Sequence, residues 1–336
     1  TGPDQSVIMT CIDIYKNINI VVRQNALEIS PCCISPARSA KRVDFLNNEY
    51  LVSLRNEIST GQLPTACSSC KNNEAAGLTS RRQGSNSWYK DHNLDNNKIE
   101  LIRMDYWTGD TCNLACVICG PNYSSVWKQE LGIPIELQKS TVNQFWKTIN
   151  LSSIQFIHFN GGEPLLSKEH VKLLHAIEHK NQVHLNYNTN GTILPNRELL
   201  NLWEQFKLVQ VDFSIDDVGE RFEYQRFPAK WDQITANLQW YIDNAPHNCM
   251  FAINTSVGIL NHANLDKLLT WLQHNFYTTR FTDPIEHRQQ LTLGVFALKD
   301  ANKIKSKIIA TLDSIDQRRG TNWRATFPEL FKQQHL

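Results

Sequence analysis

The sequence predicts an α/β protein in which helices cover a parallel sheet, with a small cysteine-rich module at the amino-terminal end. Two observations carry this prediction. From about residue 99 onward, strand-like and helix-like segments alternate six times, and parallel neighbouring strands need such helical crossovers. Residues 1–95 lack this alternation and contain five of the nine cysteines.

Six runs rich in β-branched and aromatic residues predict the strands of the sheet. They cover residues 99–106, 154–159, 183–188, 208–215, 249–259 and 290–298. Periodicity leaves two arrangements open, an open doubly wound sheet and a sheet curled into a partial barrel.

Helix-like segments separate these strands. One follows Ser167, which we expect to cap it, and the others cover 196–206, 231–243, 265–276 and 301–315. Apolar residues spaced by three and four give each helix one buried face.

The amino-terminal part is separated from this alternation by the polar stretch 91–98. We expect a strand pair over 12–22 and 25–29 and a helix over 44–58. This is little apolar surface for an independent core, so a bound metal or cluster would help the part to fold. We therefore predict three parts: a module of residues 1–95, an α/β domain of residues 96–320 and a tail of residues 321–336.

Composition argues against several classes of protein. The chain has 34 Lys and Arg against 33 Asp and Glu, a net charge of +1, which does not favour nucleic acid or an anionic membrane as partner. No apolar run approaches the ~20 residues of a spanning helix. Residues 1–30 lack the layout of a secretory signal, so we expect a cytoplasmic protein without a membrane partner.

Nine cysteines are many for such a chain, and their odd number excludes complete disulfide pairing. Seven of them lie within four residues of another cysteine, four in the amino-terminal part and three after it. In a reducing compartment, grouped cysteines are metal or cluster ligands more often than disulfide partners. Cys249 begins a predicted strand, and we expect it to be buried in the core.

Cys112, Cys116 and Cys119 form the sharpest motif, directly after the first strand of the alternation. In parallel α/β folds, ligands bind at the carboxyl ends of strands. Three thiolates separated by three and two residues suit three corners of a four-iron cluster and leave the fourth iron open. Two alternatives are a structural zinc site, which normally closes with four ligands, and a set of buried core cysteines.

Polar motifs follow the next three strands. They are Gly161, Gly162 and Glu163 after the second strand, Asn190 after the third, Ser214 and Asp216 at the fourth, and Arg226 a little later. Paired glycines let the backbone approach a ligand closely, while the other side chains offer hydrogen bonds or charge. Turn or cap roles stay open for Asn190, Ser214 and Asp216, and a surface ion pair stays open for Arg226.

The order of these motifs resembles that of the radical S-adenosylmethionine (radical SAM) superfamily. The motifs are Cys-x3-Cys-x2-Cys, Asn-Gly-Gly-Glu-Pro at 160–164, Thr-Asn-Gly at 189–191 and Asp-Phe-Ser-Ile-Asp at 212–216. The resemblance covers about residues 99–300. It implies a partial (β/α)6 TIM-type barrel and a [4Fe–4S] cluster with S-adenosylmethionine (SAM) on its open iron. The implied enzyme cleaves SAM reductively to a 5′-deoxyadenosyl radical, which abstracts hydrogen from a substrate.

The resemblance also implies roles for single residues. Glu163 would accept a hydrogen bond from the SAM ammonium group, and Arg226 would pair with the SAM carboxylate. The polar groups of Asn190, Ser214 and Asp216 would bind the ribose or the other polar end of the cofactor. Ile118 stands where many members of the family carry an aromatic residue against the adenine, so here an aliphatic side chain would pack on the base.

The second cysteine set combines a CxxC pair with a Pro-Cys-Cys segment and an earlier cysteine. Cys11, Cys67, Cys70 and one of Cys32 and Cys33 add up to four thiolates, enough for a closed site. CxxC alone is typical of zinc sites, redox pairs and clusters. The layout resembles the SPASM/twitch auxiliary-cluster modules of the same superfamily, which implies a second [4Fe–4S] cluster, with zinc as the alternative.

The resemblance implies a flavodoxin- or ferredoxin-like reductant as partner. A ribosomally made peptide is the first expectation for the substrate, and a small amino-acid or sugar metabolite is the alternative; no catalytic acid or base can be named. A hypothesis from another class is a non-enzymatic iron–sulfur or zinc protein that carries electrons or acts as a sensor.

Overall fold

A computed structural model describes residues 10–23, 27–95, 97–135, 142–275, 289–295 and 301–327. Within these residues one sheet has nine strands in the order β3-β2-β1-β4-β5-β6-β7-β8-β9. The strands are β1 (Asn17–Val22), β2 (Leu27–Ser30), β3 (Arg38–Ala40), β4 (Arg103–Trp107), β5 (Phe156–Asn160), β6 (His184–Thr189), β7 (Leu208–Ser214), β8 (Cys249–Val257) and β9 (Gln289–Val295). Every neighbouring pair from β4 to β9 is parallel, so the six predicted strands are confirmed.

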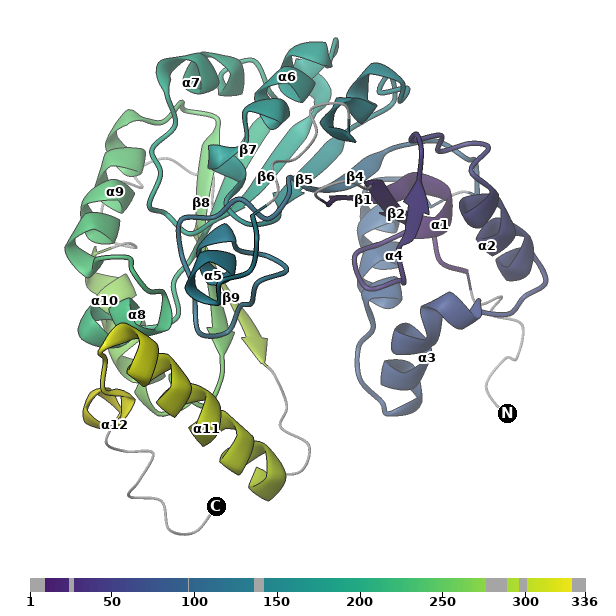
Figure 1. Cartoon of the computed structure of the whole chain (residues 1–336). Coiled ribbons are helices and arrows are strands. Elements are labelled where there is room, and N and C mark those ends of the chain that lie inside the picture. Colours follow the sequence, from purple (N-terminus) through teal and green to yellow (C-terminus); the bar gives the residue numbers. More distant parts are fainter. Residues whose placement is uncertain are drawn as a thin grey trace.

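The helices follow the strands as the alternation predicts. They are α1 (Asp13–Lys16), α2 (Glu49–Ser59), α3 (Ser68–Ala75), α4 (Arg81–Asp91), α5 (Ser125–Glu130), α6 (Lys168–Ala176), α7 (Arg197–Trp203), α8 (Gly219–Gln225), α9 (Trp231–Asn244), α10 (Leu265–Asn275), α11 (Ala301–Arg319) and α12 (Trp323–Thr326). Helices α6, α7, α9 and α10 lie along the outer side of the curved sheet (Figure 1). None of the described helices is both long and apolar enough to cross a bilayer.

The two faces of the sheet differ in chemistry. On the outer face, Ile157 and Phe159 of β5 and Leu185 and Tyr187 of β6 are buried in the main hydrophobic core. The opposite set of alternating residues forms what we call the inner face. On these four strands it consists of Arg103, Asp105 and Trp107 of β4, Phe156, His158 and Asn160 of β5, His184, Asn186 and Asn188 of β6, and Leu208, Gln210, Asp212 and Ser214 of β7.

Most inner-face residues are half-buried rather than fully buried. A closed TIM barrel fills its interior with layers of apolar side chains, whereas this inner face is largely polar. The strand order is linear, with β3 and β9 at the two edges, so the sheet does not close. The fold is therefore the predicted partial barrel.

The amino-terminal strands belong to the same sheet. Strand β1 pairs in parallel with β4, and β2 pairs antiparallel with β1, which confirms the predicted strand pair. Residues 13–16 of the first predicted strand form the short helix α1 instead. The sheet runs through the boundary that we place at residue 95, and the division into three parts remains a prediction.

One helix starts later than expected, and another lacks the expected capping hydrogen bond. Helix α2 begins at Glu49 rather than at residue 44, because the Asn48 side chain caps it by accepting from the backbone N–H groups of Tyr50 and Leu51. Ser167 occupies the N-cap position of α6 as expected, but its side chain makes no capping hydrogen bond.

Candidate active site

The cysteine triplet lies on the loop between β4 and α5. Cys116 is buried, Cys112 is half-buried and Cys119 is exposed, and all three are free thiols. Burial raises the pKa of Cys112 to about 12 and that of Cys116 to about 11. A ligand that takes these sulfurs as thiolates must therefore supply compensating positive charge, as iron ions do.

The first turns of α5 hold this loop in place. The Ser125 hydroxyl donates to the Cys112 carbonyl oxygen (2.9 Å) and accepts from the Cys112 backbone N–H (3.1 Å). The Trp127 indole N–H donates to the Cys116 carbonyl oxygen (2.8 Å). Sequence reasoning missed these residues, although the Ser124-Ser125 pair before an apolar helical segment is a recognisable helix start.

The glycine pair at the end of β5 packs against the backbone that leads into the triplet. The Gly162 N–H donates to the Gly109 carbonyl oxygen (2.8 Å), and the Glu163 N–H donates to the Thr111 carbonyl oxygen (2.8 Å). A Cβ atom on Gly161 would lie 2.8 Å from the Gly109 oxygen, and one on Gly162 would collide with the Thr111 backbone. We expected the close approach to be toward a ligand; in the structure it is toward residues 108–111.

Glu163 is buried and joins the ends of β5 and β6. Its carboxylate accepts from the Thr189 hydroxyl (2.9 Å), the Asn190 backbone N–H (2.8 Å) and the Leu165 backbone N–H (3.1 Å). Burial is the main cause that raises the pKa of Glu163 to about 7. The carboxylate therefore titrates close to neutral pH, and its contact with a cofactor ammonium group stays a prediction.

The Asn190 side chain faces the cysteine loop. Its amide nitrogen donates to the Asn113 side-chain oxygen (2.9 Å) and lies 3.9 Å from the Cys112 sulfur. Its oxygen accepts from the Thr192 backbone N–H (2.9 Å). Asn190 thus positions the triplet, and its predicted ribose contact stays a prediction.

Asp216 and Arg226 form a buried ion pair. Nε of Arg226 donates to Oδ2 of Asp216 (2.9 Å), and Nη2 of Arg226 lies 2.8 Å from the same oxygen. The remaining Nη1 lies 4.0 Å from the Cys116 sulfur. Arg226 is 7% exposed, so the surface ion pair that we left open is wrong. Ser214 ends β7 on the inner face, and its hydroxyl has no hydrogen-bond partner in the described part of the chain.

The donor set of the triplet fits a four-iron cluster with one open iron. Three free thiols lie on one loop, and besides burial their own proximity raises the pKa of Cys112 and of Cys116. A buried guanidinium stands beside Cys116, and the side-chain amide of Asn190 stands beside Cys112. Hydrogen bonds and cations near cluster sulfurs stabilise the anionic thiolate form. Among the described residues, no three His, Cys, Asp or Glu side chains, those of the triplet included, are arranged to hold a metal ion. The fit therefore rests on the chemistry of the donors and not on the arrangement of their sulfur atoms.

The structure also brings the second cysteine set together. Cys11, Cys32, Cys67 and Cys70 line one small cavity, although they come from the start of α1, the end of β2 and the start of α3. Cys33 is exposed and does not line this cavity. The geometry therefore favours Cys32 over Cys33 as the fourth member of the set. As expected, Cys249 is buried in the core.

Arg81 links this cavity to the barrel. It lines the cavity, lies 3.4 Å from the Asp13 carboxylate and donates to the Asp105 carboxylate of β4 (3.0 Å). Asp105 in turn lies 3.4 Å from Nδ1 of His158 on β5. The sequence does not reveal this chain of contacts, because its members are distant along the chain.

Ile118 lies beside an apolar cavity at the end of β8. The side chain is 56% exposed, and together with Ile259, Leu260 and Leu312 it lines a space of about 330 Å³. This cavity adjoins the triplet through Val117. An aliphatic surface next to the cysteines suits the face of a planar base.

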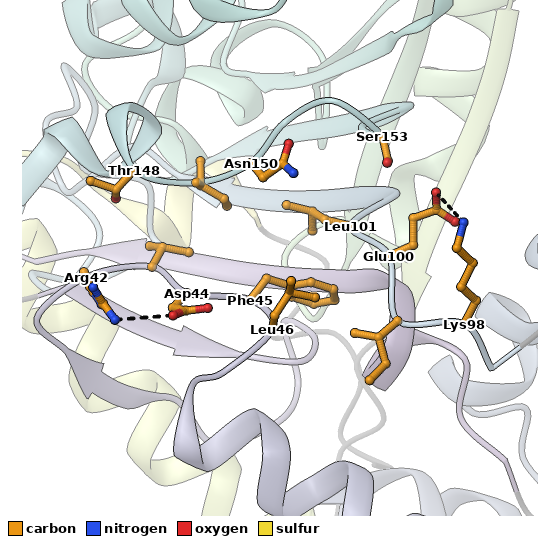
Figure 2. Close-up of a pocket in the computed structure, with 13 residues that line it drawn as sticks. Arg42, Asp44, Phe45, Leu46, Lys98, Glu100, Leu101, Thr148, Asn150 and Ser153 are labelled. Atoms are coloured by element: carbon orange, nitrogen blue, oxygen red, sulfur yellow. Dashed lines mark hydrogen bonds and ion pairs between the residues drawn. The ribbon is translucent and has the colours of Figure 1, made fainter.

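Figure 2 shows another cavity, of about 460 Å³, formed where residues 42–46 meet residues 98–101 and 148–153. Residues 98–101 precede β4 and residues 148–153 precede β5, so the cavity lies near the starting ends of these strands. Its Arg42 pairs with Asp44 and its Lys98 pairs with Glu100. The cavity contains none of the predicted site residues.

The described residues thus form an open α/β barrel that carries free thiols and a glycine–glutamate turn at the ends of its strands. Residues 108–271 match the family model of the radical SAM superfamily, and this part of the chain is a radical SAM domain. The whole chain is similar in structure to Streptococcus suis SuiB bound to S-adenosylmethionine, at 12% identity over 95% of this chain and 76% of that chain, with a TM-score of 0.42. It is also similar to native anSMEcpe with bound AdoMet, at 17% identity over 65% and 62% of the two chains, with a TM-score of 0.40.

Proposed function

We propose that the chain is a radical SAM enzyme in which Cys112, Cys116 and Cys119 hold a [4Fe–4S] cluster with SAM on its open iron. The observation that carries the proposal is one loop with three free thiols that packs against the glycine turn of residues 161–162 and has a buried guanidinium beside Cys116. When bound, the cluster supplies the electron that cleaves the sulfur–C5′ bond of SAM, which gives methionine and a 5′-deoxyadenosyl radical.

The chain's own residues bind and orient this cofactor. Glu163 accepts a hydrogen bond from the methionine ammonium group of SAM. Asp216 holds Arg226 so that its free Nη1 faces Cys116, where the positive charge stabilises the thiolate. The apolar cavity beside Ile118 takes the adenine. These contacts fix the reacting bond next to the electron source and keep water away from it.

The amino-terminal cysteines bind a second [4Fe–4S] cluster in this proposal, with zinc as the alternative. The supporting observation is that Cys11, Cys32, Cys67 and Cys70 surround one cavity. Arg81 and Arg82 line the same cavity, and their positive charge favours an anionic thiolate-ligated centre.

A peptide is the proposed substrate, and a small amino-acid or sugar metabolite is the alternative. The polar, half-buried inner face supports a substrate rich in hydrogen-bonding groups. A flavodoxin- or ferredoxin-like protein is the proposed reductant. Exposure of Cys119 supports this partner, because it brings the cluster close to the protein surface.

Metal analysis after anaerobic reconstitution tests the proposal. We expect about eight irons per chain in the wild type and about four when Cys112, Cys116 and Cys119 are all changed to Ala, as for two Cys-ligated cubanes. Cys33→Ala is the matched control and keeps the full iron content. About four irons plus one zinc in the wild type would make the amino-terminal site structural.

SAM cleavage separates the enzyme from a non-enzymatic metal protein. Cys116→Ala abolishes reductive formation of 5′-deoxyadenosine, whereas Cys67→Ala retains part of it. Equal cleavage by the wild type and Cys116→Ala would refute the site, and absence of iron from both proteins would favour the zinc-protein hypothesis.

A further inference from the structure

Four buried nitrogen atoms on the inner face have no hydrogen-bond partner among the described residues. They are Nε of Arg103, Nε1 of Trp107, Nε2 of His158 and Nε2 of His184. A buried unpaired donor costs about 1–3 kcal/mol, and native proteins contain few such groups. The Arg103 and Trp107 nitrogens are donors in every protonation state, and each histidine nitrogen is a donor in one tautomer. Together, on one face of three adjacent strands, these unpaired groups indicate a surface that binds a ligand with hydrogen-bond acceptors.

Arg103 is the charged member of this group. Aromatic rings hold its guanidinium carbon in place, at 4.4 Å from the centre of Trp88, 4.9 Å from that of Phe156 and 5.7 Å from that of Tyr89. Within the described residues it makes neither a hydrogen bond nor an ion pair, and it is half-buried. Stacking thus fixes the planar fork of the side chain and leaves its N–H groups for another partner.

The neighbouring carboxylates are already engaged. Asp105 accepts from Arg81 (3.0 Å) and from the Asn17 amide (3.3 Å). Asp13 accepts from the Ser85 hydroxyl (2.8 Å) and lies 3.4 Å from Arg81. Against the effect of burial, the charge of Arg103 helps to lower the pKa of Asp105, but the ion pairs of Asp105 are with Arg81 and His158. Within the described part of the chain, Arg103 makes no ion pair of its own.

His184 lies two strands from Arg103 at the same level of the sheet, with Phe156 between them. Its ring centre is 4.9 Å from that of Phe156. Burial, and then the nearby cations Lys207 and Arg103, lower the pKa of His184 to about 4. The ring is therefore neutral at pH 7, and its Nε2 serves as a hydrogen-bond donor in the tautomer that carries the proton there.

We infer that the inner face binds a carboxylate group of the substrate, with Arg103 as its charge partner and His184 as a second donor. A guanidinium fork matches a carboxylate in geometry and charge. The inference rests on the proposed function, which places the reacting end of the substrate at the opposite end of the strands, beside the triplet.

The spacing along β4 gives the extent of the substrate. Trp107 stands four residues beyond Arg103, next to the loop that carries the triplet. Four residues correspond to about 13 Å along a strand. Its unpaired indole N–H offers a donor along this path. A carboxylate-bearing peptide with about four extended residues between the carboxylate and the reacting carbon fits this distance.

Ligand-observed NMR on the reconstituted full chain without SAM tests the carboxylate site. The probes are N-acetylalanine, its neutral carboxamide and inorganic phosphate. We expect saturable binding of N-acetylalanine and at least tenfold weaker binding of the carboxamide. Arg103→Gln weakens N-acetylalanine binding at least tenfold. Arg103→Lys keeps the charge, and its affinity for N-acetylalanine lies between those of Arg103→Gln and the wild type. Arg42→Gln, at a side chain that is 75% exposed, is the matched control and binds like wild type.

Several results would overturn the inference. They are equal binding of the acid and the carboxamide, phosphate binding more than tenfold tighter than the carboxylate, or unchanged binding in both Arg103 variants. Thermal unfolding of each variant identifies a loss of binding that is caused by misfolding. The NMR measurement does not depend on SAM cleavage, so it tests the carboxylate site even if the proposed radical chemistry is wrong. Conversely, a protein that does not bind the carboxylate could still cleave SAM.

Discussion

Gly162 sits where two loops of the site come into backbone contact. A Cβ atom there would collide with the Thr111 backbone, which cannot move without shifting the triplet loop. We predict that Gly162→Ala lowers the free energy of unfolding by about 1–3 kcal/mol, as overpacking does, and that it reduces the iron content after reconstitution. Urea unfolding and iron analysis measure the two effects.

Gly84 provides the matched control for this prediction. It lies inside α4, and an added Cβ would meet nothing within 4 Å. Gly84→Ala should therefore raise the free energy of unfolding by about 0.5–1 kcal/mol, because alanine is the better helix former. Similar stability of the two variants would contradict the close approach of the loops.

The proposed contact of Glu163 with SAM predicts that SAM binding depends on pH. With a pKa of about 7 in the free protein, the carboxyl is mostly protonated at pH 6 and mostly ionised at pH 8. Only the ionised form attracts the ammonium group of SAM, so affinity falls as the pH drops through 7. We predict about tenfold weaker SAM binding at pH 6 than at pH 8, as one titrating group with this pKa requires.

Calorimetric titration at several pH values measures this dependence. Glu163→Gln removes the titrating group and should show the same affinity at both pH values, weaker than wild type at pH 8. A wild-type affinity that does not change between pH 6 and pH 8 would show that Glu163 acts only through its bonds to Thr189 and Asn190.

At the scale of elements, helix α5 is a support for the triplet. The buried Ser124 hydroxyl donates to the Leu114 carbonyl oxygen (2.5 Å) and accepts from the Trp127 backbone N–H (3.2 Å) as the helix N-cap. We predict that Ser124→Ala lowers the free energy of unfolding by about 1–2 kcal/mol. It should also speed iron loss to a chelator, because the loop loses an anchor.

Ser53→Ala is the control for Ser124→Ala. Ser53 is exposed on α2, and its hydroxyl donates to the Tyr50 carbonyl oxygen of its own helix. Its removal should change stability by less than about 0.5 kcal/mol and leave iron loss unchanged. Equal rates of iron loss in both variants would show that α5 does not hold the triplet.

The elements of the barrel were predictable because each follows from local periodicity. Alternating apolar residues mark β5 and β7, and the positions of Cys112 and Gly161 directly after strands follow from the same pattern. The partners of site residues were not predictable, because the contact of Asn190 with Asn113 spans 77 residues. Asn48 shows the limit of periodicity at helix ends, where one capping side chain sets the start.

At the scale of the whole molecule, Arg81 connects the amino-terminal part with the barrel. It is the shared cation of Asp13 and Asp105, both almost fully buried. We predict that Arg81→Gln lowers the free energy of unfolding by about 3 kcal/mol, because two buried carboxylates lose their partner. The exposed Arg42→Gln should cost less than about 0.5 kcal/mol in the same urea titration. Equal costs would show that the two parts are not coupled through Arg81.

The pairing of β1 with β4 matters for the order in which the chain is made. Asn17 of β1 lies opposite Arg103 of β4, so β1 leaves the ribosome long before its partner. Until residues 103–107 have emerged, the nascent amino-terminal part presents an apolar, unpaired strand edge, which is a site of aggregation. Translation speed across residues 23–103 and chaperone supply should therefore affect the yield of soluble protein.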